Sequence, residues 1–301
     1  MELGMIGLGR MGANMGQRLV NDGHRVVGFD SSAESRTRAA QNGVDSSESL
    51  AALVAALKPP RAVWMMVPAG APVDATIEAL LPLLAPGDAL IDGGNSFYKD
   101  SMRRAQTVAA KQIAYIDCGT SGGIWGLKEG YSLMIGGEEK AVERLNPIFA
   151  SLAPTHDSGW GRVGPVGSGH FTKMVHNGIE YGLMQAYAEG FAILGHKTEF
   201  ALDLPQVAEI WRHGSVVRSW LLDLAADALK KNPTLEGIAP YVADSGEGRW
   251  TLAEAIELGV SAPVIAQSLL ERLRSRDKDS FSDKLLAALR NEFGGHEIKK
   301  S

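Results

Sequence analysis

A glycine pattern near the N-terminus constrains the fold of this chain more than any other feature. Residues 7–12 read Gly-Leu-Gly-Arg-Met-Gly and match G-x-G-x-x-G, directly after the apolar run 3–7 and before a helical pattern. In that setting the first glycine permits a tight turn, the second lets the backbone approach a pyrophosphate, and the third lets helix and strand pack closely. The sequence therefore predicts the opening βαβ unit of a dinucleotide-binding sheet.

The rest of the first half alternates apolar runs with helical patterns, which is typical of a parallel sheet flanked by helices. The predicted strands are 3–7, 25–30, 62–67, 89–94, 115–119 and 131–137. A glycine-rich stretch at 157–169 predicts a domain junction, and helical periodicity dominates after it. We therefore predict an α/β Rossmann-type domain with a doubly wound, mostly parallel sheet over 1–165, and an all-helical substrate and oligomerisation domain over 166–301.

Composition and charge narrow the function classes. The 301 residues carry a net charge of −5 and a single cysteine, Cys118. Negative net charge argues against broad nucleic-acid binding, and one cysteine excludes an intrachain disulfide framework, so we expect a cytoplasmic protein. The longest apolar runs, such as 51–57, fall far short of the ~20 residues of a spanning helix, so no membrane segment is expected. Without a second cysteine or a closely spaced histidine pair, no metal site is expected either.

Asp30 ends the second predicted strand and bears on the choice of cofactor. Its carboxylate is placed to accept hydrogen bonds from the adenosine ribose hydroxyls and would repel a 2′-phosphate, which favours NAD over NADP. Two arginines, Arg36 and Arg38, follow closely, and Asp30 could instead begin a turn with Ser31. Loops after later strands also belong to the cofactor site, because ligands collect at the carboxyl ends of strands in open sheets. The predicted cofactor-binding residues are Gly7, Leu8, Gly9, Arg10, Met11, Gly12, Asp30, Val67, Pro68, Ala69 and Asn95.

A helical stretch at 167–182 contains the side chains best suited to catalysis. Lys173, Asn177 and Glu180 are offset by four and three residues, so a base, an amide and an acid share one helix face. That combination suits proton removal and return on one small substrate, as in an oxidoreductase. The competing interpretation is an ordinary solvated face. A second feature of this helix is the recurrence of Gly178, Gly182, Ala186 and Gly190 every four residues, which predicts a smooth ridge for close packing.

Several motifs in the same order point to a family. GLGRMG (7–12), DGGNS (92–96), TSGG (120–123) and KMVHNGIEYG (173–182), with DSGEGRWT (244–251) and RNEFGGH (290–296), resemble the 6-phosphogluconate dehydrogenases, which are decarboxylating enzymes of the pentose phosphate pathway. The resemblance covers most of the chain. This chain looks like the short form of the family, which has one helical unit where longer members have an extended or duplicated helical domain. It implies oxidation and decarboxylation of 6-phospho-D-gluconate to D-ribulose 5-phosphate, with NAD as hydride acceptor, no metal, and a use in gluconate utilisation.

The resemblance also implies roles for single residues. Lys173 would take the proton of the substrate 3-hydroxyl and later polarise the ketone, Glu180 would protonate the enediol carbon, and Asn177 would orient the substrate. An amine removes a proton only in its neutral form, which burial favours. The implied substrate-binding residues are Asn95, Ser121, Gly122, Gly123, His176, Asn177, Tyr181, Arg272, Arg290 and His296.

The resemblance carries one departure and one consequence for assembly. Longer members place a phosphate-contacting lysine in the loop matching 244–250, where this chain has no lysine but has Arg249. The tail with Arg290 and His296 would reach a neighbouring subunit, in a homodimer or homotetramer.

Two other functions remain open from the sequence alone. A non-decarboxylating β-hydroxyacid dehydrogenase, acting on a small acid such as 3-hydroxyisobutyrate, would keep Lys173 and Asn177 without needing Glu180 or Arg272. A non-catalytic NAD(H)-binding regulatory protein would need neither base nor acid, because a fold and a cofactor motif do not fix a function.

Overall fold

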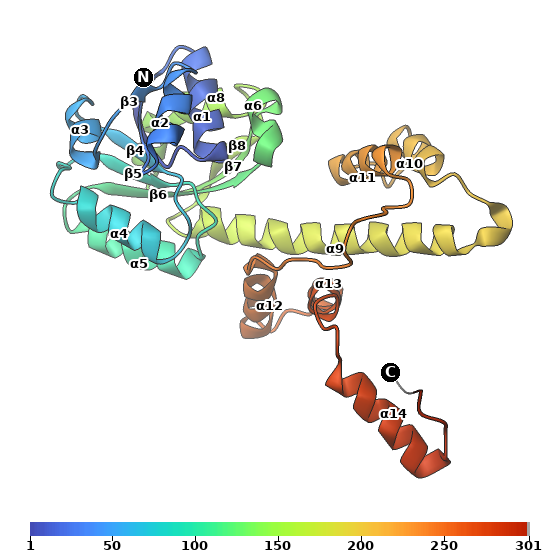
Figure 1. Ribbon diagram of the computed structural model, residues 1–301. Coiled ribbons are helices and arrows are strands. Elements are labelled where there is room, and N and C mark those ends of the chain that lie inside the picture. Colours follow the sequence, from blue (N-terminus) through green and yellow to red (C-terminus); the bar gives the residue numbers. More distant parts are fainter. Residues whose placement is uncertain (300–301) are drawn as a thin grey trace. The chain divides into compact units, whose positions relative to one another are not determined.

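The computed structural model (Figure 1) describes residues 1–299, apart from the side chain of Phe293. The chain divides into two compact units, and the boundary falls between His176 and Asn177. This boundary lies inside helix α9 (Ser168–His196), whereas the predicted ranges change at 165/166. Residues 300 and 301 of the predicted second range lie outside the described part.

The first unit is built on one sheet, in the strand order β3-β2-β1-β4-β5-β6-β7-β8. Its strands are β1 (Glu2–Ile6), β2 (Arg25–Phe29), β3 (Asp45–Ser46), β4 (Ala62–Met65), β5 (Ala89–Asp92), β6 (Ala114–Ser121), β7 (Ser132–Gly136) and β8 (Trp160–Gly164). Every neighbouring pair is parallel except β6 and β7. From β1 the strand order runs through β2 to β3 on one side and through β4 to β8 on the other. This order confirms the predicted doubly wound, mostly parallel sheet.

Two strands were not predicted. β3 has only two residues, both exposed, and lies at one edge of the sheet. β8 lies at the other edge, within the glycine-rich stretch predicted as a domain junction. Its sequence WGRVG lacks the apolar alternation that marks a half-buried strand, because only one neighbour covers it. The stretch 157–169 therefore completes the sheet before it leads to α9.

Helices cover both faces of this sheet (Figure 1). The helices of the first unit are α1 (Arg10–Asn21), α2 (Ala33–Ala40), α3 (Leu50–Ala55), α4 (Ala71–Leu80), α5 (Tyr98–Ala109), α6 (Gly126–Glu129), α7 (Glu139–Arg144) and α8 (Asn146–Leu152), with a 3-10 turn η1 (Gly123–Trp125). Successive strand residues point to opposite faces, so the core has two layers. One layer packs Leu3 and Met5 of β1 with α1 and α8, and the other packs Ile6 of β1 with α3, α4 and α5.

The second unit is helical. It contains the C-terminal part of α9, a 3-10 turn η2 (Thr198–Phe200), and α10 (Leu204–Arg212), α11 (Trp220–Lys231), α12 (Glu247–Glu257), α13 (Pro263–Arg274) and α14 (Phe281–Gly294). Side-chain caps begin several of these helices, as where the Ser219 hydroxyl accepts the Leu222 N–H at 3.1 Å. None of the helices within residues 1–299 combines the length and apolar character that crossing a membrane requires.

The spacing of small residues along α9 has a packing reason at two positions. A Cβ at Gly178 would lie 2.7 Å from Cγ2 of Thr251 on α12, and one at Gly182 would lie 3.2 Å from Cγ1 of Val264 on α13. These two glycines therefore confirm the predicted close packing. At Gly190 a Cβ would meet no atom of the described residues within 4 Å, so the prediction is wrong there for this chain by itself.

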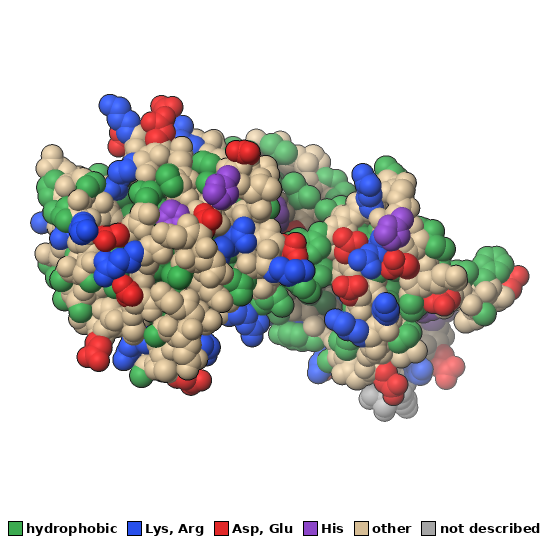
Figure 2. Space-filling model, turned by 90° about the horizontal axis from the view of Figure 1, so that it is seen from above, with side chains coloured by type: hydrophobic (Ala, Val, Ile, Leu, Met, Phe, Trp, Pro, Cys, Tyr) green, Lys and Arg blue, Asp and Glu red, His purple; other side chains and the backbone are tan. Residues whose placement is uncertain are grey.

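Positive and negative side chains alternate on the surface shown in Figure 2. Lys and Arg are interspersed with Asp and Glu, and the drawn face has no broad area of one sign.

Candidate active site

The glycine loop after β1 has the geometry that its motif predicts. Gly7 has a φ of +89°, and a Cβ there or at Gly12 would overlap a backbone carbonyl oxygen. At Gly9 a Cβ would meet no described atom within 4 Å, so this side of the loop is open. Helix α1 has no side-chain cap and no acidic residue in its first turn. Its free N–H groups and positive dipole end therefore fit the pyrophosphate of a dinucleotide.

Asp30 follows β2 and forms a hydrogen bond with the glycine loop. Its carboxylate accepts the N–H of Leu8 at 2.7 Å and the N–H of Ser32 at 2.8 Å. Arg36 donates to the Asp30 carbonyl oxygen at 2.7 Å. The structure therefore contains the turn that the sequence offered as an alternative. An ionised carboxylate can accept about four hydrogen bonds, so it keeps capacity for ribose hydroxyls.

Three predicted loops follow neighbouring strands of the sheet. Residues 67–70 follow β4, Asn95 follows β5, and Ser121 ends β6. Because β4, β5 and β6 are adjacent and parallel, their carboxyl ends lie at one edge of the sheet. Gly122 and Gly123 both have positive φ, at +137° and +51°, which lets the loop after β6 turn sharply. The structure thus gathers the predicted cofactor and substrate loops of this unit.

Lys173 is buried in the first third of α9. It is 8% exposed, and its Nζ lies 3.3 Å from Nδ1 of His176. Asn177, four residues later, is also 8% exposed, and Glu180 is half-buried. These burials contradict the solvated-face interpretation for the lysine and the amide. Since α9 is continuous from Ser168 to His196, the three side chains keep the shared helix face that their spacing predicts.

Strand β6 anchors the start of α9 through Asp117, whose role was not predicted. This fully buried carboxylate accepts the N–H of Gly167 at 2.7 Å and the N–H of His170 at 2.8 Å. It thereby satisfies donors that a helix N-terminus leaves unpaired. A Cβ at Gly119 would overlap Cβ of Lys173, so the glycine lets α9 lie directly on the strand. The one sequence signal for this anchor is an aspartate inside an apolar strand, since a buried carboxylate needs donors.

In the second unit, Tyr181 and Arg272 come together. The Arg272 guanidinium lies 3.5 Å from the centre of the Tyr181 ring and donates to the Ala243 carbonyl oxygen at 3.1 Å. The Tyr181 hydroxyl lies 3.4 Å from that of Ser245, in the loop 244–250. A cation and two hydroxyl groups therefore converge, which suits a phosphate.

Arg249, the basic residue of the same loop, is already paired. Its guanidinium donates to Asp244, which also accepts the N–H of Gly246 at 3.1 Å. Burial would raise the pKa of Asp244, but these hydrogen bonds hold it below its ordinary value. Arg249 therefore serves to close its own loop in this structure.

Two predicted substrate residues are not gathered with the others. Arg290 is exposed on α14, and His296 is exposed after it. Tyr181 and Arg272, by contrast, pack against each other within α9 and α13.

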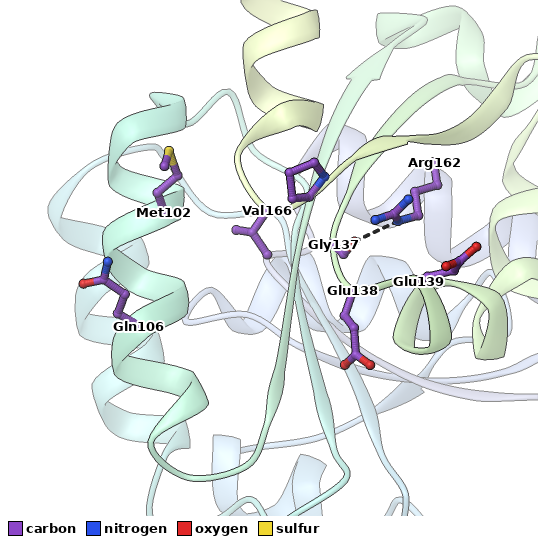
Figure 3. Close-up of a pocket in the computed structure, with 8 residues that line it drawn as sticks. Met102, Gln106, Gly137, Glu138, Glu139, Arg162 and Val166 are labelled. Atoms are coloured by element: carbon purple, nitrogen blue, oxygen red, sulfur yellow. Dashed lines mark hydrogen bonds between the residues drawn. The ribbon is translucent and has the colours of Figure 1, made fainter.

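The first unit also contains a pocket of about 440 Å³ (Figure 3). It is lined by Met102, Gln106, Gly137, Glu138, Glu139, Arg162, Pro165 and Val166. None of these residues belongs to the predicted site, and Arg162 is held by the Gly137 carbonyl oxygen at 2.8 Å. Within residues 1–299 no group of three or more His, Cys, Asp or Glu side chains is arranged to hold a metal ion.

Comparison with known proteins gives matches along the whole chain. Residues 2–161 match the NAD binding domain of 6-phosphogluconate dehydrogenase, and residues 169–300 match the C-terminal domain of the same enzyme. A protein of Haloferax volcanii named 6-phosphogluconate dehydrogenase, NAD(+)-dependent, decarboxylating, is 47% identical over 301 residues, covering 100% of this chain and 99% of its own.

Two solved structures share the fold of this chain. Plasmodium falciparum 6-phosphogluconate dehydrogenase superposes with a TM-score of 0.84 at 30% identity, over 100% of this chain and 66% of its own. Mycobacterium tuberculosis 3-hydroxyisobutyrate dehydrogenase, at 22% identity and a TM-score of 0.72 over 89% of this chain and 90% of its own, shares the fold. Because both family models match in chain order and a relative is 47% identical over 99% of its own length, the chain belongs to the 6-phosphogluconate dehydrogenase family.

Proposed function

We propose that this chain catalyses the NAD-dependent oxidative decarboxylation of 6-phospho-D-gluconate to D-ribulose 5-phosphate and CO2. The observation that carries the proposal is the burial of Lys173 on a helix that continues through Asn177 and Glu180, anchored on a dinucleotide-binding sheet. The name of the Haloferax volcanii relative supports the same reaction and the same cofactor.

The cofactor site is formed by the glycine loop, Asp30, residues 67–69 and Asn95. Bound there, NAD supplies the hydride acceptor. The Asp30 carboxylate accepts ribose hydroxyls and disfavours a 2′-phosphate through its charge. The open side of Gly9 leaves room for the pyrophosphate at the N-terminus of α1.

Lys173 carries the proton of the oxidation step. Its neutral amine takes the proton from the substrate 3-hydroxyl as C3 is oxidised to a ketone. The resulting ammonium then gives this proton to the ketone oxygen of the β-keto acid as the C1–C2 bond breaks and CO2 leaves, which forms an enediol. Glu180 delivers a proton to C2 of the enediol while Lys173 takes the hydroxyl proton back from the C3 oxygen, which gives the ketose product. Asn177 and His176, with Asn95 and residues 121–123, orient the substrate.

Tyr181 and Arg272 meet the phosphate end of the substrate in this proposal. Arginine suits this task because its guanidinium binds phosphate oxygens in a bidentate way. The remaining contacts come from Arg290 and His296 of a neighbouring subunit. Four apolar side chains of α14 support such docking, because they are between 46% and 76% exposed in the single chain: Phe281, Leu285, Leu286 and Leu289.

A subunit-mixing experiment tests the shared site. Lys173→Met and Arg290→Ala chains are unfolded and refolded together, and the activity is compared with that of each variant alone. If the tail completes the neighbour's site, a mixed dimer has one site with neither change, and about a quarter of wild-type activity returns. If the tail serves its own subunit, the mixture stays as inactive as its parts.

Turnover tests the reaction itself. The chain is expected to release CO2 and NADH in equal amounts from 6-phosphogluconate without added metal. NADH without CO2 would indicate the non-decarboxylating dehydrogenase, and NAD binding without turnover would indicate the regulatory protein. Glu180→Gln should lower turnover strongly, whereas Glu189→Gln, an exposed carboxylate on the same helix, should not.

The single cysteine bears on location. Cys118 is fully buried, and burial raises the pKa of its thiol. A protein with one buried thiol gains no stabilisation from an oxidising compartment, so we place it in the cytoplasm.

A further inference from the structure

A buried arginine contacts both the cofactor loop and the substrate loop of the first unit. Arg104 on α5 is 1% exposed, and its guanidinium contacts four groups. It donates to both carboxylate oxygens of Asp74 at 2.9 and 3.2 Å, to the Gly70 carbonyl oxygen at 3.0 Å and to the Ser96 hydroxyl at 3.3 Å. It also lies 3.5 Å from the Asp92 carboxylate.

Two of these contacts are made to functional loops. Gly70 ends the loop 67–70 after β4, which belongs to the proposed cofactor site, and caps α4 with a φ of +87°. Ser96 ends the loop 93–96 after β5, which carries Asn95 next to it. One guanidinium thus bridges the backbone of the cofactor loop and a side chain of the substrate loop.

Asp92, which directly precedes the loop 93–96, also holds this loop and lies beside the Arg104 guanidinium. Asp92 is fully buried and accepts the Ser96 hydroxyl at 2.7 Å, the Tyr115 hydroxyl at 3.0 Å and the N–H of Gly94 at 3.2 Å. Burial and the nearby Asp92 raise the pKa of Tyr115 well above its ordinary value, so its phenol remains a donor. Asp92 therefore defines the loop, and Arg104 compensates its buried charge.

Arginine is required by the geometry of this bridge. Its planar fork presents five N–H donors in fixed directions, so it can bind a carboxylate in a bidentate way and still reach a carbonyl and a hydroxyl. The Arg104 hydrogen bonds hold the pKa of Asp74 below its ordinary value, which keeps that partner ionised. A lysine has one charged atom on a flexible stem and cannot make all these contacts together.

We propose that Arg104 is a positioning residue, which sets the distance between the cofactor loop 67–70 and Asn95 and so aligns substrate and nicotinamide for hydride transfer. This inference rests on the proposed function for its effect on turnover. Its effect on cofactor binding depends only on the dinucleotide-binding fold. Arg104 touches neither substrate nor cofactor in this proposal; it acts through the two loops.

Arg103 provides a matched control. It is adjacent to Arg104 on α5 and donates to the same Asp74 oxygens at 3.0 and 3.2 Å, but it is exposed and also pairs with Asp100. Arg103→Lys therefore perturbs Asp74 without touching either loop. Arg104→Lys keeps the positive charge near Asp74 and Asp92 and removes the bridge.

The test compares steady-state kinetics and NADH binding for the two lysine variants. For Arg104→Lys we expect kcat to fall about 10- to 100-fold, because displacements near 1 Å cost rates of that order. We also expect the KM for 6-phosphogluconate and the Kd for NADH to rise several-fold, at a folded fraction equal to that of Arg103→Lys by circular dichroism. Equal kinetics and equal NADH binding in the two variants would overturn the proposal.

Ser96→Ala separates the two loops and covers the case in which Arg104→Lys does not fold. It releases only the loop 93–96, so the KM for 6-phosphogluconate should rise several-fold. The Kd for NADH should rise by a smaller factor, because the loop 67–70 keeps its Arg104 contact and Asn95 is the one residue of the proposed cofactor site that is released. An unchanged KM would show that the bridge does not position Asn95. If the wild-type chain does not turn over 6-phosphogluconate at all, the proposed function fails. Weaker NADH binding by Arg104→Lys than by Arg103→Lys would still support the bridge.

Discussion

Gly119→Ala is expected to move Lys173, the proposed catalytic base, without changing any functional group. Gly119 lies on β6 directly beneath α9. An added Cβ would overlap Cβ of Lys173 and lie 2.8 Å from the carbonyl oxygen of Gly169. Neither neighbour is the flexible end of a side chain, so α9 itself must move.

The size of the displacement sets the size of the effect. Non-bonded carbon atoms settle at about 3.5–4.0 Å, so the two Cβ atoms must separate by roughly 1–1.5 Å. Overpacking of this kind costs about 1–3 kcal/mol, whereas a compatible Gly→Ala change gains only about 0.4–1 kcal/mol from the unfolded state. The variant should therefore be less stable by about 1–2 kcal/mol. A misplacement near 1 Å at the reacting groups should lower kcat about 100-fold.

Gly161→Ala is the control for this change. Gly161 lies on β8 of the same sheet, and a Cβ there would meet no described atom within 4 Å. Its stability should stay within about 1 kcal/mol of wild type, with unchanged turnover. Urea unfolding, NADH titration and kcat at saturating substrates are measured for both variants. Turnover of Gly119→Ala within threefold of the Gly161→Ala value would refute the argument that this contact places Lys173.

Three further changes probe other parts of the structure. Gly9→Ala finds open space in the fold, so stability should hold while the Kd for NAD, by calorimetric titration, rises at least about tenfold because the methyl group blocks the pyrophosphate. Asp117→Asn leaves one of two buried N–H donors, those of Gly167 and His170, without its charged acceptor, so urea unfolding should show a loss of about 1.5–3 kcal/mol; a stability equal to wild type would mean that α9 is anchored otherwise. Burial raises the pKa of the Cys118 thiol, so a chromogenic disulfide reagent at pH 8 should react with it only after unfolding, and immediate release from the native protein would contradict this.

The sequence predicted the sheet well because its strands are buried on both faces. All four residues of β4 and of β5 are buried, and such continuous apolar runs stand out without a partner. β3 and β8 escaped prediction because an edge strand needs neither an apolar run nor alternation. Spacing along one helix likewise predicted the shared face of Lys173 and Glu180, since it depends only on helical geometry.

What sequence could not supply is the set of contacts between distant segments. Asp117 holds backbone groups 50 and 53 residues away, and Arg104 contacts a carbonyl 34 residues earlier. No local pattern links such residues, because the sheet topology alone brings them together. The same limit explains why Arg290 and His296 were assigned from resemblance only.

The placement of Lys173 follows from backbone contacts more than from side-chain contacts. A Cβ at Gly136 would lie 2.7 Å from the amide nitrogen of Gly169, and one at Gly169 would overlap the carbonyl oxygens of Asp117 and Met134. Glycines thus let two strands and the first turn of α9 approach at backbone distance. Side-chain packing can relax by changing rotamers, but backbone-to-backbone contact leaves little freedom to shift. Lys173, four residues beyond such a contact, is therefore positioned by the main chain, which explains why this region needs glycine from β6, from β7 and from α9 at once.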